Sequence, residues 1–217
     1  MTGGFITLEG TEGGGKSTQA ALLGERLRRA GRVVRVVREP GGTELSEAIR
    51  DLLKHHPAGA RMTSEAELLL MNAARAQLVG EVIRPALAAG EMVVCDRFHH
   101  STLAYQGWGR GLALERVREV VGFAVGGTLP DITLLLRVPP EVSLARRRAR
   151  ESSGGEEADR FEREGAEFFE RVAEGYRRLA EEEPGRVVSV DGTLPIMTVH
   201  ERIWEIVTAR WPETGMG

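Results

Sequence analysis

Eight residues near the start of the chain have the types and spacing of a loop that binds nucleotide phosphates. The segment reads Gly10-Thr11-Glu12-Gly13-Gly14-Gly15-Lys16-Ser17 and matches G-x-x-x-x-G-K-[ST] at every fixed position. Glycines let successive backbone N–H groups turn toward a phosphate, and a following helix adds the positive end of its dipole. Lys16 supplies a positive charge to the β- and γ-phosphates, and the Ser17 hydroxyl can ligate Mg²⁺. The segment from Gly10 to Thr18 is therefore predicted to bind a nucleoside triphosphate with magnesium.

Switches, motors and kinases all share this loop, so other residues must distinguish them. The chain has no N/T-K-x-D segment that would read a guanine base. Its third apolar run ends in a single acidic residue, Asp96, whereas motors typically have an acidic pair and a longer chain. Asp96 at a strand end can orient Mg²⁺, and Arg97 beside it offers a cation to a phosphate. An ordinary surface Asp-Arg pair would have the same spacing.

Arginines form two groups that bear on the same question. The first is Arg146, Arg147, Arg148 and Arg150, which lead into a polar segment at 150–160. They form either a solvated basic face beside a surface loop, or part of a lid that stabilises transition-state charge and excludes water. The second group, predicted near the ligand edge of the sheet, is Arg38, Arg50, Arg75 and Arg97. Two groups of cations suit two phosphate-bearing substrates, which favours a nucleotide kinase.

Short apolar runs that alternate with longer helical patterns must position these residues. The runs are Phe5–Leu8, Val33–Val37, Met92–Cys95, Ile132–Val138 and Val187–Val190. Their near-continuous apolarity indicates strands covered on both faces, so we expect a doubly wound α/β domain with a parallel sheet. Capping patterns predict two helix starts, at Ser64-Glu65-Ala66-Glu67 and at Thr198-Val199-His200-Glu201. The first helix should extend to about Ala89 and the second to about Arg210.

The composition is that of one folded domain spanning residues 1–217. The 217 residues include 29 Lys+Arg and 32 Asp+Glu, a formal net charge of −3, and 41% are hydrophobic. The near-neutral balance predicts no binding to nucleic acid or to an anionic membrane. The lone Cys95 cannot form an internal disulfide, and no apolar run approaches the ~20 residues that span a bilayer. Since the N-terminus lacks a signal-peptide pattern, we expect a cytoplasmic protein.

Four blocks spread from residue 5 to about residue 193 add a more specific pattern. They are Phe5-Ile6-Thr7-Leu8-Glu9-Gly10 with the phosphate loop, Arg38-Glu39-Pro40-Gly41-Gly42-Thr43, Asp96-Arg97-Phe98 with Ser101-Thr102-Leu103-Ala104-Tyr105-Gln106-Gly107, and Leu129-Pro130-Asp131-Ile132-Thr133-Leu134 followed by the arginine-rich segment. Together they resemble the thymidylate kinase family. The resemblance implies a P-loop nucleoside monophosphate kinase-like fold, with a five-stranded parallel sheet, helices on both faces and a short lid at about 146–160. It also implies a homodimer.

The resemblance implies a reaction and a set of site residues. The reaction transfers the γ-phosphoryl group of ATP to dTMP, giving dTDP and ADP with Mg²⁺, in the synthesis of dTTP. ATP would bind at Gly10–Thr18, with Ser17 and Asp96 near the metal. The implied dTMP site is Glu12, Arg38, Arg50, Met71, Arg75, Arg97, Thr102, Tyr105 and Gln106. Within it, the phosphate would meet Arg38, Arg50 and Arg97, the thymine edge would meet Arg75, and Tyr105 would crowd a 2′-hydroxyl.

The implied catalytic residues are Lys16, Arg97, Arg146, Arg148 and Arg150. The lid arginines enter because Gly13 stands where some family members carry an arginine in the phosphate loop. Met71 stands where the family often has a phenylalanine that stacks on thymine, although a thioether can also pack against a ring. Arg137 stands where the fourth strand often ends in aspartate.

Two alternatives remain open at this point. One is a broader kinase for several nucleoside or deoxynucleoside monophosphates, which Met71 would permit. The other is a non-catalytic nucleotide-binding sensor on the same fold, against which an intact phosphate loop and lid count. Formation of ADP separates the sensor from both kinases, and the dependence of ADP formation on the acceptor separates the two kinases.

Overall fold

A sheet of five parallel strands organises the structure, a computed structural model that describes residues 3–152 and 159–214. The strands are β1 (Gly4–Glu9), β2 (Val34–Arg38), β3 (Met92–Asp96), β4 (Ile132–Arg137) and β5 (Val187–Asp191). Their order across the sheet is β2-β3-β1-β4-β5, and every neighbouring pair is parallel. The predicted five-stranded parallel sheet is confirmed.

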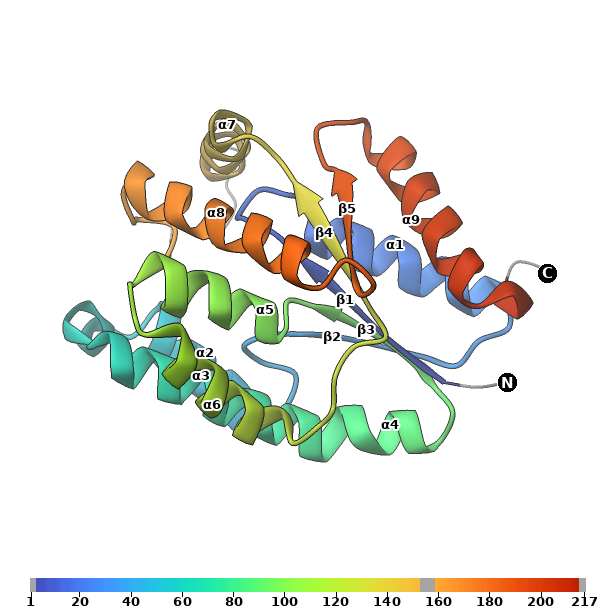
Figure 1. Cartoon of the computed structure of the whole chain (residues 1–217), viewed down its shortest axis with the longest axis horizontal. Coiled ribbons are helices and arrows are strands. Elements are labelled where there is room, and N and C mark those ends of the chain that lie inside the picture. The colour runs from blue at the N-terminus through green and yellow to red at the C-terminus, as the bar shows by residue number, and fades with distance from the viewer. Residues whose placement is uncertain (1–2, 153–158, 215–217) are drawn as a thin grey trace.

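Helices connect the strands and cover both faces of the sheet (Figure 1). They are α1 (Lys16–Arg29), α2 (Glu44–Lys54), α3 (Ser64–Leu78), α4 (Arg84–Ala88), α5 (His99–Thr102), α6 (Leu114–Val125), α7 (Pro140–Ser152), α8 (Ala166–Glu182) and α9 (Ile196–Arg210), with short 3₁₀ turns at Pro57–Arg61 and Pro212–Thr214. π-Helical turns at Val79–Ile83 and Leu103–Gly109 extend α3 into α4 and continue α5. None of the helices in the described ranges is long and apolar enough to cross a bilayer.

Alternate residues of β1 face two apolar cores. Ile6 and Leu8 pack with α1 and α9, whereas Phe5 packs with α3, α6 and α8, and all three are at most 1% exposed. Burying one such side chain contributes about 1.5–3 kcal/mol. Burial on both faces explains why the strands read as nearly continuous apolar runs. Cys95 lies in the core on the Phe5 side as a buried free thiol.

Two helix starts differ from the predicted capping patterns. Thr63, not Ser64, caps α3, because its hydroxyl accepts the Ala66 N–H over 3.2 Å. Glu67, expected to reach back to the cap, is buried and instead binds Arg110 over 3.0 Å. The last helix begins at Ile196, after Pro195, so that Thr198 lies inside the first turn. Proline fixes φ near the helical value and needs no N–H partner, which makes it a good residue at a helix start.

The carboxyl ends of the strands bring charged residues to one edge of the sheet. Glu9, Arg38 and Asp96 end β1, β2 and β3, and β3 lies between the other two strands. Arg38 is the register partner of Asp96. Ligands of open α/β sheets bind at this edge, where the strand order reverses. The loops that follow β1, β2 and β3 therefore form the candidate site.

Candidate functional site

The loop between β1 and α1 has a backbone that can surround a phosphate. Gly10, Gly13 and Gly15 have φ angles of 133°, 71° and 88°, which residues with a side chain rarely adopt. A Cβ atom at Gly10 would also lie 2.4 Å from the Leu136 carbonyl oxygen. Gly15 caps α1 and has open space where a Cβ would stand. Backbone N–H groups at such a helix start attract anions.

Lys16, the first residue of α1, holds its ammonium group inside this loop. Nζ donates to the Thr11 carbonyl over 2.7 Å, and the residue is 5% exposed. Burial lowers the pKa of Lys16 to about 8, and repulsion from Arg97 adds to this shift, against the carboxylates of Glu12 and Asp96. The ammonium is therefore a poorly solvated cation, which an entering phosphate would stabilise.

Ser17 and Asp96 meet beside Lys16 and offer oxygen atoms to a cation. Ser17 Oγ donates to Asp96 Oδ2 over 2.5 Å. The other carboxylate oxygen, Asp96 Oδ1, is buried and has no hydrogen-bond partner among the residues that the structure describes. Hydroxyl and carboxylate oxygens are ligands that Mg²⁺ prefers, and Mg²⁺ takes few of them when phosphates and water complete its shell. The two residues fit the predicted magnesium site.

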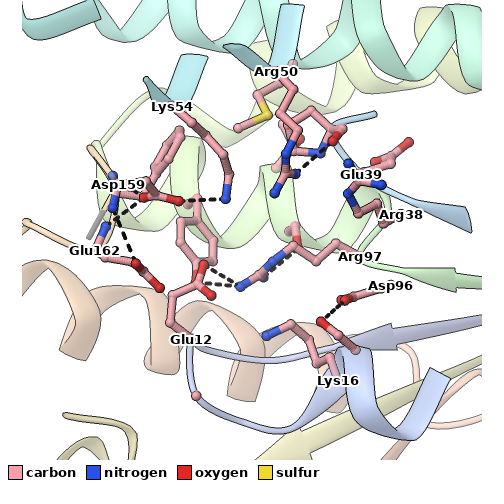
Figure 2. Close-up of a pocket in the computed structure, with 18 of the residues that line it drawn as sticks. Glu12, Lys16, Arg38, Glu39, Arg50, Lys54, Asp96, Arg97, Asp159 and Glu162 are labelled. Atoms are coloured by element: carbon pink, nitrogen blue, oxygen red, sulfur yellow. Dashed lines mark hydrogen bonds and ion pairs between the residues drawn. The ribbon is translucent and has the colours of Figure 1, made fainter. Parts of the chain in front are cut away.

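A cleft of about 480 Å³ extends from the phosphate loop to α3 (Figure 2). Clefts of about 300–1,000 Å³ are typical of small-molecule sites. The predicted site residues that line it are Glu12, Gly13, Gly15, Lys16, Ser17, Thr18, Arg38, Arg50, Met71, Arg75, Asp96, Arg97, Thr102, Tyr105 and Gln106. Gly10, Thr11 and Gly14 belong to the loop without lining the cleft. The chain thus brings most of the predicted set together in one cavity.

Arg97 lies in the middle of the cleft, with its guanidinium toward Glu12 (Figure 2). One nitrogen donates to Glu12 Oε1 over 2.7 Å and to the Tyr105 hydroxyl over 3.2 Å. The other donates to the Gly10 carbonyl over 3.0 Å and to Ser101 Oγ over 3.1 Å. Arg97 is also the one non-glycine residue in the described ranges with a positive φ, 70°. Such backbone strain persists only where surrounding contacts hold it, and it clusters at functional sites.

The far end of the cleft is built around Arg75 on α3. Its side chain is 2% exposed and forms an ion pair with Glu39, in which Nε and Nη2 both donate to Oε2, over 2.9 and 2.7 Å. Burial raises the pKa of the Glu39 carboxyl, while Arg75 opposes that shift. Thr102 accepts a hydrogen bond from Arg75 over 2.9 Å, and Met71 lies one helical turn before Arg75. A flat ring resting on Met71 would present its edge to this polar group.

Arg38 and Arg50 extend the positive charge on the α2 side of the cleft. Arg38 pairs with Glu47 over 2.9 Å, and Arg50 donates to the Pro40 carbonyl over 2.9 Å. Together with Arg97 they line one part of the cavity with three guanidinium groups. Planar guanidiniums bind phosphate in a bidentate manner, so this arrangement suits a phosphate monoester.

Sequence reasoning missed several residues that line the cleft. They are Glu39, Pro40, Lys54, Ser101, Asp159, Phe161 and Glu162. Lys54 and Asp159 form an ion pair of 2.6 Å (Figure 2). The sequence did offer a signal for Lys54, because the chain has only two lysines and the other, Lys16, lies in the phosphate loop. Both lysines line the cleft. The sequence offered no such signal for Asp159, because this residue lies in the polar segment at 150–160, which was interpreted only as a surface loop or a lid.

The arginines of α7 lie in different surroundings. Arg146 donates to the carbonyls of Gly13 and Gly192, at 3.3 and 2.9 Å, and so connects the phosphate loop to the turn after β5. Arg147 is buried against Phe169, with 4.3 Å between the guanidinium and the ring centroid. Arg148 is exposed, and neither it nor Arg146 lines the cleft. The side chain of Arg150 and residues 153–158 of the predicted lid lie outside the described residues.

Arg137, which departs from the family pattern, ends β4 opposite Asp191 of β5. The Thr193 hydroxyl and N–H donate to Asp191 Oδ1 over 2.6 and 2.9 Å. These bonds, with a smaller contribution from Arg137, lower the pKa of Asp191. Arg137 therefore balances a carboxylate at the sheet edge.

Comparison with known proteins identifies a family and several similar proteins. A family model described as thymidylate kinase matches residues 8–203. A thymidylate kinase of Synechococcus sp. (strain JA-2-3B'a(2-13)) is 51% identical over 208 residues, which are 96% of each chain. One of Pseudomonas fluorescens (strain Pf0-1) is 51% identical over 203 residues, 94% of each chain. The crystal structure of thymidylate kinase from Ehrlichia chaffeensis is similar with a TM-score of 0.76 and 30% identity, over 96% of this chain and 99% of that one.

Proposed function

The chain belongs to the thymidylate kinase family, and we propose that its cleft transfers the γ-phosphoryl group of ATP to dTMP, giving dTDP and ADP. One observation carries this proposal. A single cavity is lined by the phosphate loop with Lys16, by the guanidiniums of Arg38, Arg50 and Arg97, and by the Arg75 group. Donor phosphates, acceptor phosphate and acceptor base can therefore bind in one cavity.

The residues that face the phosphates have separate roles in the reaction. Lys16 and the loop N–H groups hold the β- and γ-phosphates of ATP. Arg38, Arg50 and Arg97 hold the phosphate of dTMP and align one of its oxygens with the γ-phosphorus. Ser17 and Asp96 hold Mg²⁺, which neutralises phosphate charge when bound. Because a phosphate monoester is already ionised at neutral pH, no general base is needed, and catalysis is positioning plus electrostatic stabilisation.

The nucleoside part of dTMP binds beyond Arg97. Thymine packs on Met71, with its edge toward Arg75 and Thr102, and Gln106 lies beside the base and deoxyribose. Glu12 faces the 3′-hydroxyl region. Tyr105 is buried, and its hydroxyl accepts from Arg97 over 3.2 Å, so its ring is fixed where it excludes a 2′-hydroxyl.

The remaining parts of the proposal concern the lid, the domain and the location. Residues 1–217 form one kinase domain in which segment 146–160 is the lid, and Arg146, Arg148 and Arg150 complete the charge clamp when it closes. The cytoplasm, where free thiols stay reduced, is the location that fits the lone buried Cys95.

Release of ADP with different acceptors tests the function directly. With Mg-ATP, we expect turnover with dTMP to exceed turnover with dUMP, UMP, dCMP, AMP and GMP, and chelation of the metal to abolish it. Equal turnover with several acceptors would still support a kinase, but it would contradict a pocket that is specific for thymine. ATP and dTMP binding without ADP release would support the sensor alternative, which relatives named thymidylate kinase do not favour.

The pH dependence of ATP use should follow the ammonium of Lys16. Because burial lowers its pKa to about 8, the free enzyme loses this cation as the pH rises above 8. We expect kcat/KM for ATP to fall about tenfold per pH unit above that point, since this ratio reports groups of the free enzyme. At saturating ATP, kcat should stay constant to a higher pH, because bound phosphates stabilise the charged form of Lys16. A level kcat/KM up to pH 9.5 would contradict the role of Lys16.

A homodimer is the assembly that we propose, and an exposed apolar surface on α2, α3 and α6 supports it. The surface is Leu45, Leu52, Leu69 and Phe123, of which Phe123 is 91% and Leu69 is 59% exposed. Helix α3 packs against both α2 and α6, so the three helices that carry these exposed side chains lie together (Figure 1). Large apolar side chains gathered in this way mark an interaction site, which two-fold symmetry can pair with itself.

The charged double variant Leu69→Glu/Phe123→Glu tests this assembly. We expect it to sediment as a monomer, because a carboxylate on each side of the two-fold axis would be buried without a partner. Val33→Glu is the matched control, since Val33 is 66% exposed but lies outside these helices. A double variant that keeps the mass of the wild type would place the interface elsewhere.

A further inference from the structure

Every N–H group of the Arg75 guanidinium already has a partner within the protein. Nε and one Nη2 hydrogen go to the Glu39 carboxylate, at 2.9 and 2.7 Å. The second Nη2 hydrogen goes to the Phe98 carbonyl at 3.1 Å. Nη1 donates to Asn72 Oδ1 at 2.8 Å and to Thr102 Oγ1 at 2.9 Å. A guanidinium has five donor hydrogens, so Arg75 is saturated and held in one orientation.

Glu39 is the partner that makes this arrangement possible. Of the groups that accept from Arg75 it alone carries a charge, and the two side chains are 5% and 2% exposed. A guanidinium this deeply buried needs a carboxylate partner, because an uncompensated charge in such a place is strongly destabilising. The Glu39 backbone is fixed in turn, since its N–H donates to the Asp96 carbonyl over 2.9 Å.

The saturated guanidinium of Arg75 determines in which direction the Thr102 hydroxyl donates its hydrogen bond. A hydroxyl has one hydrogen and two lone pairs, and Arg75 occupies one lone pair. The cation behind the oxygen turns the O–H bond away from itself, and Thr102 lines the cleft. The hydroxyl therefore presents a donor, in a positive local potential, to whatever base occupies this end of the cleft. A carbonyl oxygen would be attracted there, and an amino group would be repelled.

We propose that Glu39 is a positioning residue that, through Arg75 and the Thr102 hydroxyl, makes the cleft select an acceptor base with a carbonyl group over one with an amino group at the edge it presents. The inference rests on the proposed dTMP kinase function. It assigns the preference for thymine over cytosine to a buried ion pair, whereas Met71 supplies only ring packing. Because Glu39 follows Arg38 in the chain, one short segment serves both the acceptor phosphate and the acceptor base.

Three ligands separate the base from the phosphate in the test. They are dTMP, 5-methyl-dCMP, which carries an amino group at position 4 in place of the carbonyl, and 2-deoxyribose 5-phosphate, which has no base. Calorimetry with the full-length protein should show that Glu39→Gln lowers the preference for dTMP over 5-methyl-dCMP by about tenfold or more, the size of a charged hydrogen bond. Affinity for 2-deoxyribose 5-phosphate should not change, and Glu39→Asp should keep most of the preference.

Two control variants distinguish a change in base preference from a general structural effect of the substitution. Glu91→Gln removes a carboxylate that pairs with Arg35 over 2.7 Å outside the cleft, and it should alter neither ligand preference nor KM for ATP. Thr102→Val removes the hydroxyl and should lose the same preference, so that Glu39→Gln adds no further loss in its presence. If Glu39→Gln does not fold, Thr102→Val and Glu39→Asp still test the proposal.

Equal weakening of all three ligands by Glu39→Gln, or an unchanged preference in Thr102→Val, would overturn the inference. A wild-type protein that binds dTMP and releases ADP while the variants keep its preference would refute this inference alone. A wild-type protein that does not turn over dTMP would refute the proposed function instead.

Discussion

Replacing Lys16 with alanine is expected to lower turnover by about 10²–10³-fold, the usual effect of removing one fixed group that stabilises transition-state charge. Its ammonium lies within the phosphate loop and is held there by the Thr11 carbonyl, to which it donates over 2.7 Å. Phosphoryl transfer spreads charge over the oxygens of the γ-phosphoryl group, and a cation already in place stabilises that charge without rearrangement. ADP release at saturating ATP and dTMP measures the effect.

The stability of the Lys16→Ala variant separates this effect from misfolding. Burial disfavours the charged ammonium, as the lowered pKa of about 8 indicates, so removing it should leave Tm unchanged or raise it. Arg29→Ala is the matched control, because Arg29 ends the same helix with a side chain that is 79% exposed. It should keep wild-type turnover. Near-wild-type turnover of Lys16→Ala would show that this lysine does not act on the phosphates.

Local pattern was enough to predict the sheet and the phosphate loop. The strands were found because burial on both faces requires nearly continuous apolar runs, which Ile6 and Leu8 exemplify. The loop was found because its glycines occupy positive-φ positions that few other residues tolerate. Helix starts were less predictable: Thr63 and Ser64 are both good capping residues, and only the backbone decides which hydroxyl meets a free N–H.

Contacts between distant residues could not be predicted in the same way. Glu39 and Arg75 are 36 residues apart, and Lys54 and Asp159 are 105 apart. Neither pair has a periodicity that one sequence could reveal, because their approach depends on how α2, α3 and the segment after α7 pack. At the acceptor end, the sequence therefore predicted a group of arginines near the ligand edge, the family resemblance supplied their roles, and Glu39 was seen as part of a motif without a role.

Replacing Arg97 is expected to lower turnover by about 10³-fold or more, because it removes a cation that the proposed mechanism gives to the acceptor phosphate and to the transition state. Arg97 also joins the phosphate loop to the acceptor side, through Glu12 at 2.7 Å and Tyr105 at 3.2 Å. Its loss should therefore raise KM for dTMP as well as lower kcat, while KM for ATP changes less. Initial rates over a matrix of ATP and dTMP concentrations distinguish these parameters.

The backbone of Arg97 provides the control that a simple truncation lacks. A non-glycine residue at a φ of 70° costs about 1–2 kcal/mol, so Arg97→Gly should unfold at higher denaturant concentration than Arg97→Ala. Both variants should be equally inactive, since neither restores the guanidinium. Arg97→Lys returns a charge without the planar fork and should recover only part of the turnover. If Arg97→Gly were active where Arg97→Ala is not, turnover would depend on the backbone conformation at this position rather than on the guanidinium.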